Sequence, residues 1–112
     1  MKWNYITTLE QLANIDELSA SQPILIFKHS TTCSISAMAL NRIESNWKEE
    51  FELKAKPYIL DLLANRSISN EIASRYGVIH ESPQVLIIEN GKSVYDESHS
   101  GIRLNDVLEA VK

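Results

Sequence analysis

Residues 24–36 have the sequence ILIFKHSTTCSIS, in which a strand-like run leads directly into a helix-like one. We predict a strand over Ile24–Lys28 that is apolar enough to be buried on both faces of a sheet. An amphipathic helix is predicted from about Ser34 to Glu50, because apolar residues recur there at three- and four-residue spacing. Those apolar residues are Ile35, Met38, Ala39, Ile43 and Trp47. Cys33 therefore lies at the hinge between a buried strand and the first turn of a helix.

Short strands and helices alternate through the rest of the chain. Further strands are predicted over residues 3–6, 57–62, 85–89 and 93–96, and further helices over residues 9–18, 69–76 and 104–111. Thr8 is the expected N-cap of the first of these helices, and Gly77 is at the C-terminal cap position of the second. The apolar side of the first helix consists of Leu9, Leu12, Ala13 and Ile15. Asn90-Gly91 supplies the positive φ angles of a type I′ turn, which predicts a hairpin between the last two strands.

The order of these elements, β-α-β-α-β-α-β-β-α, predicts a single α/β domain over residues 1–112. Parallel strands joined by right-handed crossovers, followed by a hairpin and a last helix, form a central mixed sheet with helices on both faces. This is the topology of the thioredoxin-like fold.

Composition and charge narrow the range of functions. The chain is 44% hydrophobic and 23% charged, with a formal net charge of −4 and no dense block of Lys and Arg. Nucleic acid and anionic membrane surfaces both need a concentrated basic footprint, so neither is expected as a partner. The apolar runs are too short to span a bilayer, and the first five residues lack the apolar core of a signal peptide. We therefore expect a soluble protein in the cytoplasm.

Cys33 is the only cysteine, which excludes an internal disulfide and any Cys-rich zinc site. At a helix N-terminus the backbone N–H groups lack helical partners and the helix dipole is positive, and both favour the thiolate, the nucleophilic form. The alternative is a buried, inert core cysteine. The small polar neighbours of Cys33 are Thr31, Thr32, Ser34 and Ser36. They suit an accessible turn better than a core, so we predict a reactive thiol.

Ser36 occupies the position of the second cysteine in a Cys-x-x-Cys pair. A second thiol would resolve a mixed disulfide internally, which a serine cannot do. The predicted cycle is therefore monothiol: Cys33 accepts a thiol adduct, and another thiol removes it. Ser36 is equally explained as a polar residue whose hydroxyl helps the helix to start, and the two interpretations are compatible.

Pro83 opens the strand predicted over residues 85–89, within the segment Glu81-Ser82-Pro83-Gln84. This position is compatible with a cis Ser82–Pro83 bond, and equally with an ordinary strand-opening proline. Spacing alone leaves both open.

Two segments resemble known families. Residues 73–78, ASRYGV, and 82–92, SPQVLIIENGK, are similar to the second half of thioredoxins, where such a helix leads to a cis-proline and a strand closed by a tight turn. Residues 27–36, FKHSTTCSIS, closely resemble the monothiol bacilliredoxins, small general-stress proteins with the signature Thr-Cys-Pro-Ile-Ser. The likeness covers nearly the whole chain, including His99-Ser100-Gly101. Ser34 replaces the usual proline, which should alter the rigidity of the helix start more than the chemistry.

The bacilliredoxin resemblance implies a thiol–disulfide oxidoreductase that removes bacillithiol, a low-molecular-weight thiol, from mixed disulfides on proteins. Cys33 would attack the disulfide and take up the bacillithiol, and free thiol or another redoxin would regenerate it. The implied partners are S-thiolated client proteins, the small thiol as co-substrate, and a recycling redoxin or reductase, with no tightly bound cofactor or metal. Ser34, Ile35 and Ser36 form the helix start, with Ser36 in the resolving position. Thr32, Ser82 and Pro83 are the implied substrate-binding residues, and the thioredoxin resemblance favours a cis bond before Pro83.

Further candidates rest on chemistry alone. Lys28 or His29 can supply positive charge near a thiolate. His99 and the turn Ser100-Gly101, leading to a helix N-terminus, can hold a carboxylate of the small thiol. The alternative is that Lys28 is solvated and that both histidines are surface residues. A metal site of His29 and Cys33 with His80 or His99 is set aside, because the spacing matches no zinc site.

Three other functions compete with this interpretation. A monothiol-glutaredoxin-like protein would use glutathione or hold an iron–sulfur cluster, but its Cys-Gly-Phe-Ser signature shares only its ends with residues 33–36. A peroxidase is disfavoured because the threonines stand one and two residues before Cys33, the usual upstream proline is missing, and the chain is short. A thioredoxin-like binding module with an idle cysteine is also compatible with the sequence, since fold does not dictate function.

Overall fold

One mixed sheet organises the computed structural model, which describes residues 1–111. Its five strands among these residues lie in the order β1-β3-β2-β4-β5. β1 and β2 pair in parallel with β3, and β4 is antiparallel to both β2 and β5. The strands are β1 (Asn4–Tyr5), β2 (Ile24–His29), β3 (Lys56–Asp61), β4 (Gln84–Glu89) and β5 (Lys92–Ser98). The predicted α/β thioredoxin-like arrangement is confirmed.

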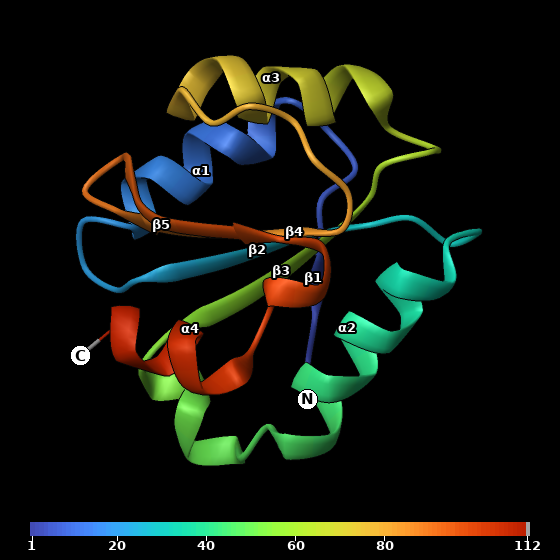
Figure 1. The fold of residues 1–112 in the computed structure, drawn as a ribbon. Coiled ribbons are helices and arrows are strands. Elements are labelled where there is room, and N and C mark those ends of the chain that lie inside the picture. Colours follow the sequence, from blue (N-terminus) through green and yellow to red (C-terminus); the bar gives the residue numbers. More distant parts are fainter. Residues whose placement is uncertain (112) are drawn as a thin grey trace.

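Helices cover both faces of this sheet. Figure 1 shows α1 and α3 on one face and α2 and α4 on the other. The helices are α1 (Glu10–Leu18), α2 (Ser34–Asn46), α3 (Arg66–Tyr76) and α4 (Leu104–Ala110), with short 3-10 helices η1 (Glu49–Leu53) and η2 (His99–Gly101). No helix within residues 1–111 combines the length and the apolar character needed to cross a bilayer.

Burial of β2 on both faces is confirmed, and it divides the core in two. Side chains alternate across a strand, so Ile24 and Ile26 join the cluster under α1 and α3, while Leu25 and Phe27 join the cluster under α2 and α4. All four are fully buried. Burial of such side chains stabilises the fold by about 1.5–3 kcal/mol each. β2 is therefore a rigid base for the segment that follows it, residues 30–33.

The predicted turns are also confirmed. Asn90 and Gly91 have φ angles of 52° and 72°, and Glu89 pairs with Lys92 across the two-residue turn. Gly77 ends α3 in the left-handed conformation, with φ of 66°.

The start of α1 differs from the prediction. Thr8 is not its N-cap; the cap position is Leu9, without a side-chain hydrogen bond. Gln11 Oε1 accepts hydrogen bonds from the backbone N–H groups of Thr7 and Thr8, at 2.6 and 2.9 Å. The Gln11 amide therefore reaches back to the N–H groups at the helix start, and the helix begins one residue later than a Thr8 cap would place it.

α2 is shorter than the predicted helix over 34–50 and turns a different side to the core. Trp47 has an extended backbone, with φ −72° and ψ 133°. Its ring contacts the ring of Phe51 in η1 edge to face, with 5.7 Å between the ring centroids. Helix geometry thus ends at Asn46. The buried residues of α2 are Ser36, Ala39 and Ile43.

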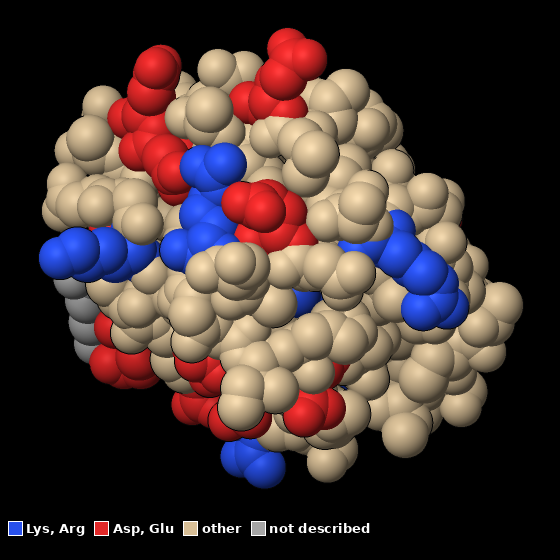
Figure 2. Space-filling model, turned by 90° about the horizontal axis from the view of Figure 1, so that it is seen from above, with Lys and Arg blue, Asp and Glu red and all other residues tan. Residues whose placement is uncertain are grey.

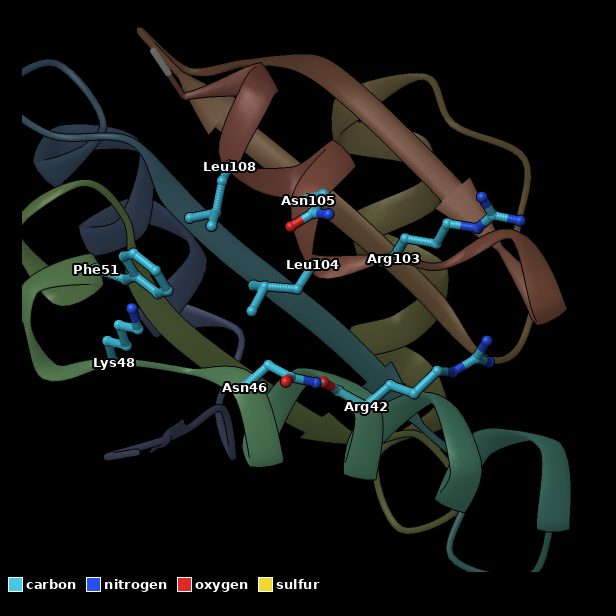
Figure 3. A pocket seen from close by; sticks show the side chains of 8 residues that line it. All are labelled: Arg42, Asn46, Lys48, Phe51, Arg103, Leu104, Asn105 and Leu108. Carbon is cyan, nitrogen blue, oxygen red and sulfur yellow. Dashed lines mark hydrogen bonds between the residues drawn. The ribbon is translucent and has the colours of Figure 1, made fainter.

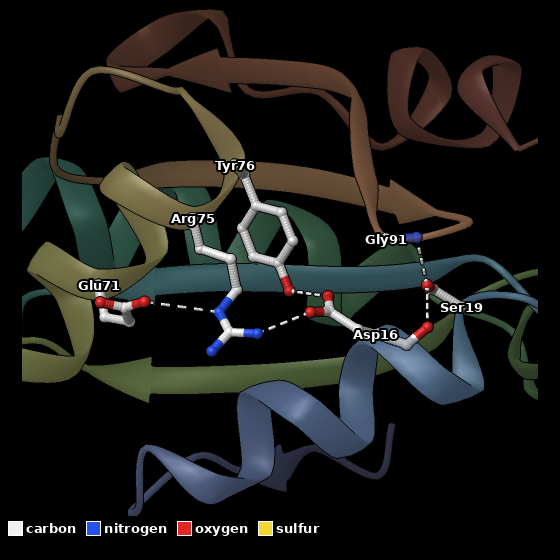
Figure 4. Close-up of polar contacts among 6 residues, drawn as sticks. All are labelled: Asp16, Ser19, Glu71, Arg75, Tyr76 and Gly91. Carbon is white, nitrogen blue, oxygen red and sulfur yellow. Dashed lines mark hydrogen bonds and ion pairs between the residues drawn. The ribbon is translucent and has the colours of Figure 1, made fainter.

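A polar network joins α1, α3 and the β4–β5 hairpin (Figure 4). The carboxylate of Asp16 accepts hydrogen bonds from Arg75 Nη1 at 2.7 Å and from Tyr76 Oη at 2.6 Å. Burial and this bond to Asp16 raise the pKa of Tyr76. The Ser19 hydroxyl donates to the Asp16 carbonyl oxygen and accepts from Gly91 N–H. These contacts hold the two helices and the hairpin together. They lie at the opposite end of the sheet from Cys33.

Charged side chains are interspersed on the face formed by α1 and α3. Figure 2 shows acidic and basic groups alternating there in small patches. Arg75 of α3 forms two ion pairs on this face: its Nη1 lies 2.7 Å from Asp16 Oδ2, and its Nε lies 3.7 Å from Glu71 Oε1.

Candidate active site around Cys33

Cys33 lies between β2 and α2, as the sequence predicts. It is the N-cap of α2, with an extended backbone (φ −103°, ψ 121°), and it is partly exposed. Its N–H donates to the Ser30 carbonyl at 3.2 Å, and its own carbonyl accepts from Ala37 N–H at 3.0 Å. The first-turn N–H groups of α2 have no helical acceptor. The thiol is therefore held at the positive end of a helix anchored to a buried strand.

Ser36 is fully buried and turned away from solvent. Its hydroxyl oxygen accepts the Ser30 N–H at 3.0 Å and lies 2.6 Å from His29 Nδ1. The serine in the resolving position thus joins the end of β2 to the first turn of α2. The predicted role of the Ser36 hydroxyl at the start of the helix is confirmed by its bond to Ser30 N–H. Its contact with His29 was not predicted.

His29 is half-buried on the same face of the sheet as α2. Burial lowers the pKa of His29, and the negative charges of Asp61 and Glu44 oppose that shift without reversing it. The lowered pKa disfavours the protonated form of His29, which was one candidate source of positive charge near the thiolate.

A hollow of about 250 Å³ lies beside the active-site loop. Its walls include His29, Thr31 and Asp61, together with the aromatic rings of Trp3 and Tyr5. One carboxylate oxygen of Asp61 is buried without a hydrogen-bond partner within residues 1–111. The hollow and its aromatic walls were not predicted, since β1 comes close to the loop only through its pairing with β3.

Lys28 is fully buried, so the expectation that it is solvated is wrong. Its position in β2 directs it to the side of α3, opposite to His29. Its Nζ donates to the Ser69 carbonyl at 3.1 Å and lies 3.3 Å from His80 Nδ1. Burial lowers the pKa of Lys28 to about 8. The pKa of His80 is lowered as well, first by burial and then by the charge of Lys28.

The Ser82–Pro83 bond is cis, as the resemblance to thioredoxins implied. Gln84 pairs with Lys28, so Pro83 lies level with His29 at the end of the sheet that carries Cys33. Pro83 is buried and Ser82 is half-buried.

His99, Ser100 and Gly101 form η2, which lies against the Pro83 segment. His99 N–H donates to the Pro83 carbonyl at 2.9 Å, and its exposed ring lies 2.8 Å from Glu81. Ser100 is exposed. The helix that follows begins at Leu104, as predicted, and Ser100-Gly101 precedes it as part of η2. Within residues 1–111 no three His, Cys, Asp or Glu side chains are placed to hold a metal, and His80 and His99 do not join Cys33 in one.

Exposed apolar side chains follow Cys33 in α2 and precede Pro83 in the chain. Ile35 and Met38 of α2 are 48% and 64% exposed, although the periodicity placed them on the buried side of the helix. The helix face that packs against the core consists instead of Ser36, Ala39 and Ile43. Ile79, in the loop before Pro83, is 84% exposed.

Replacing Ser36 by alanine is expected to destabilise the protein by about 1–2 kcal/mol, because the Ser30 N–H and the His29 ring lose a buried partner. Urea unfolding measures the change. Ser45→Ala is the matched control, since that exposed hydroxyl donates to the Asn41 carbonyl one turn earlier in α2 and accepts only a long bond from Asn46 Nδ2, at 3.5 Å. Equal losses in the two variants would contradict a structural part for the Ser36 contact.

Comparison with known proteins agrees with this geometry. A family model described as monothiol bacilliredoxin BrxC matches residues 4–107. A solved structure described as a putative oxidoreductase with a thioredoxin fold is 28% identical, with a TM-score of 0.82, covering 96% of this chain and 92% of that one. The thioredoxin of Malassezia sympodialis is 14% identical, with a TM-score of 0.75 and coverage of 98% and 88%. Fasciola hepatica thioredoxin is 18% identical, with a TM-score of 0.75 and coverage of 97% and 99%. The likeness to the two thioredoxins concerns the fold alone.

Proposed function

The chain belongs to the monothiol bacilliredoxin family, and from this premise we propose that it removes bacillithiol from mixed disulfides on client proteins through Cys33. The observation that carries the proposal is the pairing of one partly exposed thiol at the N-cap of α2 with a buried serine in the resolving position. A nucleophile without a resolving thiol has to pass its adduct to another molecule.

The proposed cycle has two exchange steps. The Cys33 thiolate attacks the bacillithiol sulfur of the mixed disulfide; the client thiolate leaves, and a disulfide forms between Cys33 and bacillithiol. A second thiol, from free bacillithiol or a recycling redoxin, then attacks the bacillithiol sulfur and releases the Cys33 thiolate. Each step breaks one disulfide and forms one. Ser36 takes no part as a nucleophile, because its hydroxyl is buried between His29 and Ser30.

The surface around Cys33 supports a protein as one substrate. Ile35 and Met38, which follow Cys33 in α2, present exposed apolar groups beside the thiol. Such groups contribute to protein recognition when they are covered. By analogy with the residue before the cis-proline of thioredoxins, we assign backbone contacts with the client chain to Ser82, and Thr32 lies exposed beside the thiol. We place this activity in the cytoplasm, where thiols are kept reduced.

Transfer of the adduct tests the proposal. Reduced protein is mixed with a model protein that carries a bacillithiol mixed disulfide, and both are followed by intact-mass spectrometry, with a glutathionylated model protein in parallel. Because the chain has one cysteine, any adduct it gains is on Cys33. The expected result is that the bacillithiol adduct moves from client to Cys33, and faster than the glutathione adduct.

The competing functions give different results in the same sample. If neither adduct moves while iodoacetamide still alkylates Cys33, the catalytic proposal is wrong and the binding-module interpretation replaces it. Preference for the glutathione adduct, or an absorbance band above 400 nm in fresh protein, would instead favour a glutaredoxin-like function.

A further inference from the structure

A second hollow, of about 440 Å³, lies between α2, η1 and α4 (Figure 3). Its apolar lining comes from Phe51, Leu104 and Leu108. Its charged lining residues are all basic, namely Arg42, Lys48 and Arg103. This gathering of positive charge stands out in a chain whose formal net charge is −4. Its volume is in the range of small-molecule sites, and its lining combines three apolar residues with five polar or charged ones.

These three cations have no carboxylate partner within residues 1–111: the ion pairs there involve other residues. Arg42 Nε is moreover buried without a hydrogen-bond acceptor in that part of the chain. A buried donor left without an acceptor is unfavourable, so the site is best completed by an acceptor from outside the chain. An anionic group meets this need, because guanidinium ions bind carboxylates through two parallel hydrogen bonds.

The two arginines extend toward the end of the molecule that carries Cys33. In Figure 3 the Arg42 side chain runs along α2 toward the N-terminus of that helix, and the Arg103 side chain extends in the same direction. Helical side chains point toward the N-terminus in general. Arg42 follows Cys33 by nine residues, which at 1.5 Å per residue is roughly 13 Å between the two Cα atoms. The direction of the Arg42 side chain shortens this span to one that a small thiol of two or three linked units can cover.

We propose that Arg42 and Arg103 bind the carboxylate groups of the low-molecular-weight thiol that Cys33 exchanges. The arginine end of the hollow is then a specificity site for anionic thiols. This assignment rests on the proposed function, because the link to a thiol follows from the exchange at Cys33. The anion site itself rests only on the hollow and its unpaired cations.

Binding of an anion is tested without redox chemistry, on the full-length Cys33→Ser protein. Succinate is the probe and neutral succinamide its control, each titrated while the arginine Nε–H signals are followed by NMR. We expect saturable shifts of the Arg42 and Arg103 signals with succinate, weakened by salt, and none with succinamide. Arg42→Gln and Arg103→Gln should each weaken binding roughly tenfold. Arg66→Gln, at the exposed start of α3, is the matched control. Equal binding by all variants overturns the anion site.

The assignment to the thiol is tested with the wild-type active site. Arg42→Gln and Arg103→Gln should raise KM for glutathione, which carries carboxylates, by roughly tenfold while kcat stays the same. KM for neutral 2-mercaptoethanol should not change. If the wild-type protein exchanges no small thiol at all, the proposed function fails while succinate binding still reports on the anion site. If exchange is normal and the arginine variants match the wild type, the proposed function stands and this inference is wrong.

Discussion

Replacing Cys33 by serine is expected to reduce transfer of the small thiol from client proteins to the rate observed without protein, a loss of at least about a thousandfold. The hydroxyl of serine does not form a disulfide, so no adduct can be held in the first step. No other thiol can take over, since Cys33 is the only cysteine of the chain. The measurement is the rate of adduct loss from the client protein, by intact-mass spectrometry.

This variant should fold normally, which separates lost chemistry from lost structure. Cys33 is partly exposed and its structural contacts are made by its backbone, to Ser30 and Ala37. Circular dichroism and urea unfolding should therefore match the wild type. Ser74→Ala, on the exposed surface of α3, serves as the control for substitution as such and should keep full transfer. Residual transfer by Cys33→Ser above the background rate would show that another group of the chain acts on the disulfide.

Replacing Lys28 by methionine is expected to stabilise the protein by about 3 kcal/mol at pH 7. Burial lowers the pKa of Lys28 from 10.5 to about 8. At about 1.4 kcal/mol per pH unit, this difference is the penalty for carrying the charged ammonium in the folded state. Methionine has a similar length and no charge, so it removes the penalty and keeps the volume filled.

The advantage of Lys28→Met should disappear as the pH rises. Between pH 8 and 10.5 the unfolded chain keeps a proton on Lys28 that the folded chain has released, so stability of the wild type increases with pH in this window. The difference is thus fully present below pH 8 and lost above pH 10.5. Urea unfolding of both proteins at pH 7 and pH 10.5 measures it, with Lys92→Met on the exposed part of β5 as control. A less stable Lys28→Met protein at pH 7 would mean that the contacts with Ser69 and His80 outweigh the cost of burial.

Much of the fold was predictable because its signals are local. The two-sided burial of β2 follows from its apolar run, and the hairpin follows from Asn90-Gly91. The place of Cys33 at the start of α2 follows from the change in hydrophobic period after the strand. The cis bond before Pro83 was open on spacing and was decided correctly by the resemblance to thioredoxins.

The errors concern side chains whose surroundings come from distant parts of the chain. Periodicity placed Ile35 and Met38 inside, because it cannot tell which of two adjoining helix faces meets the sheet. Lys28 was expected in solvent because it is charged, yet its position in β2 and the packing of α3 bury it. Thr8 was expected to cap α1, but Gln11 supplies the hydrogen bonds there.

The sequence by itself thus determined the α/β thioredoxin-like topology, the position of Cys33 at the start of α2 and the absence of a second thiol. These depend on hydrophobic period, turn chemistry and residue identity, which each short segment carries within itself. Only the tertiary structure decided that Ser36 is bonded to His29, that Lys28 is buried beside His80, and that Arg42 and Arg103 line one hollow. Such contacts depend on which faces of separate elements meet, and packing sets that geometry after the local structure is formed.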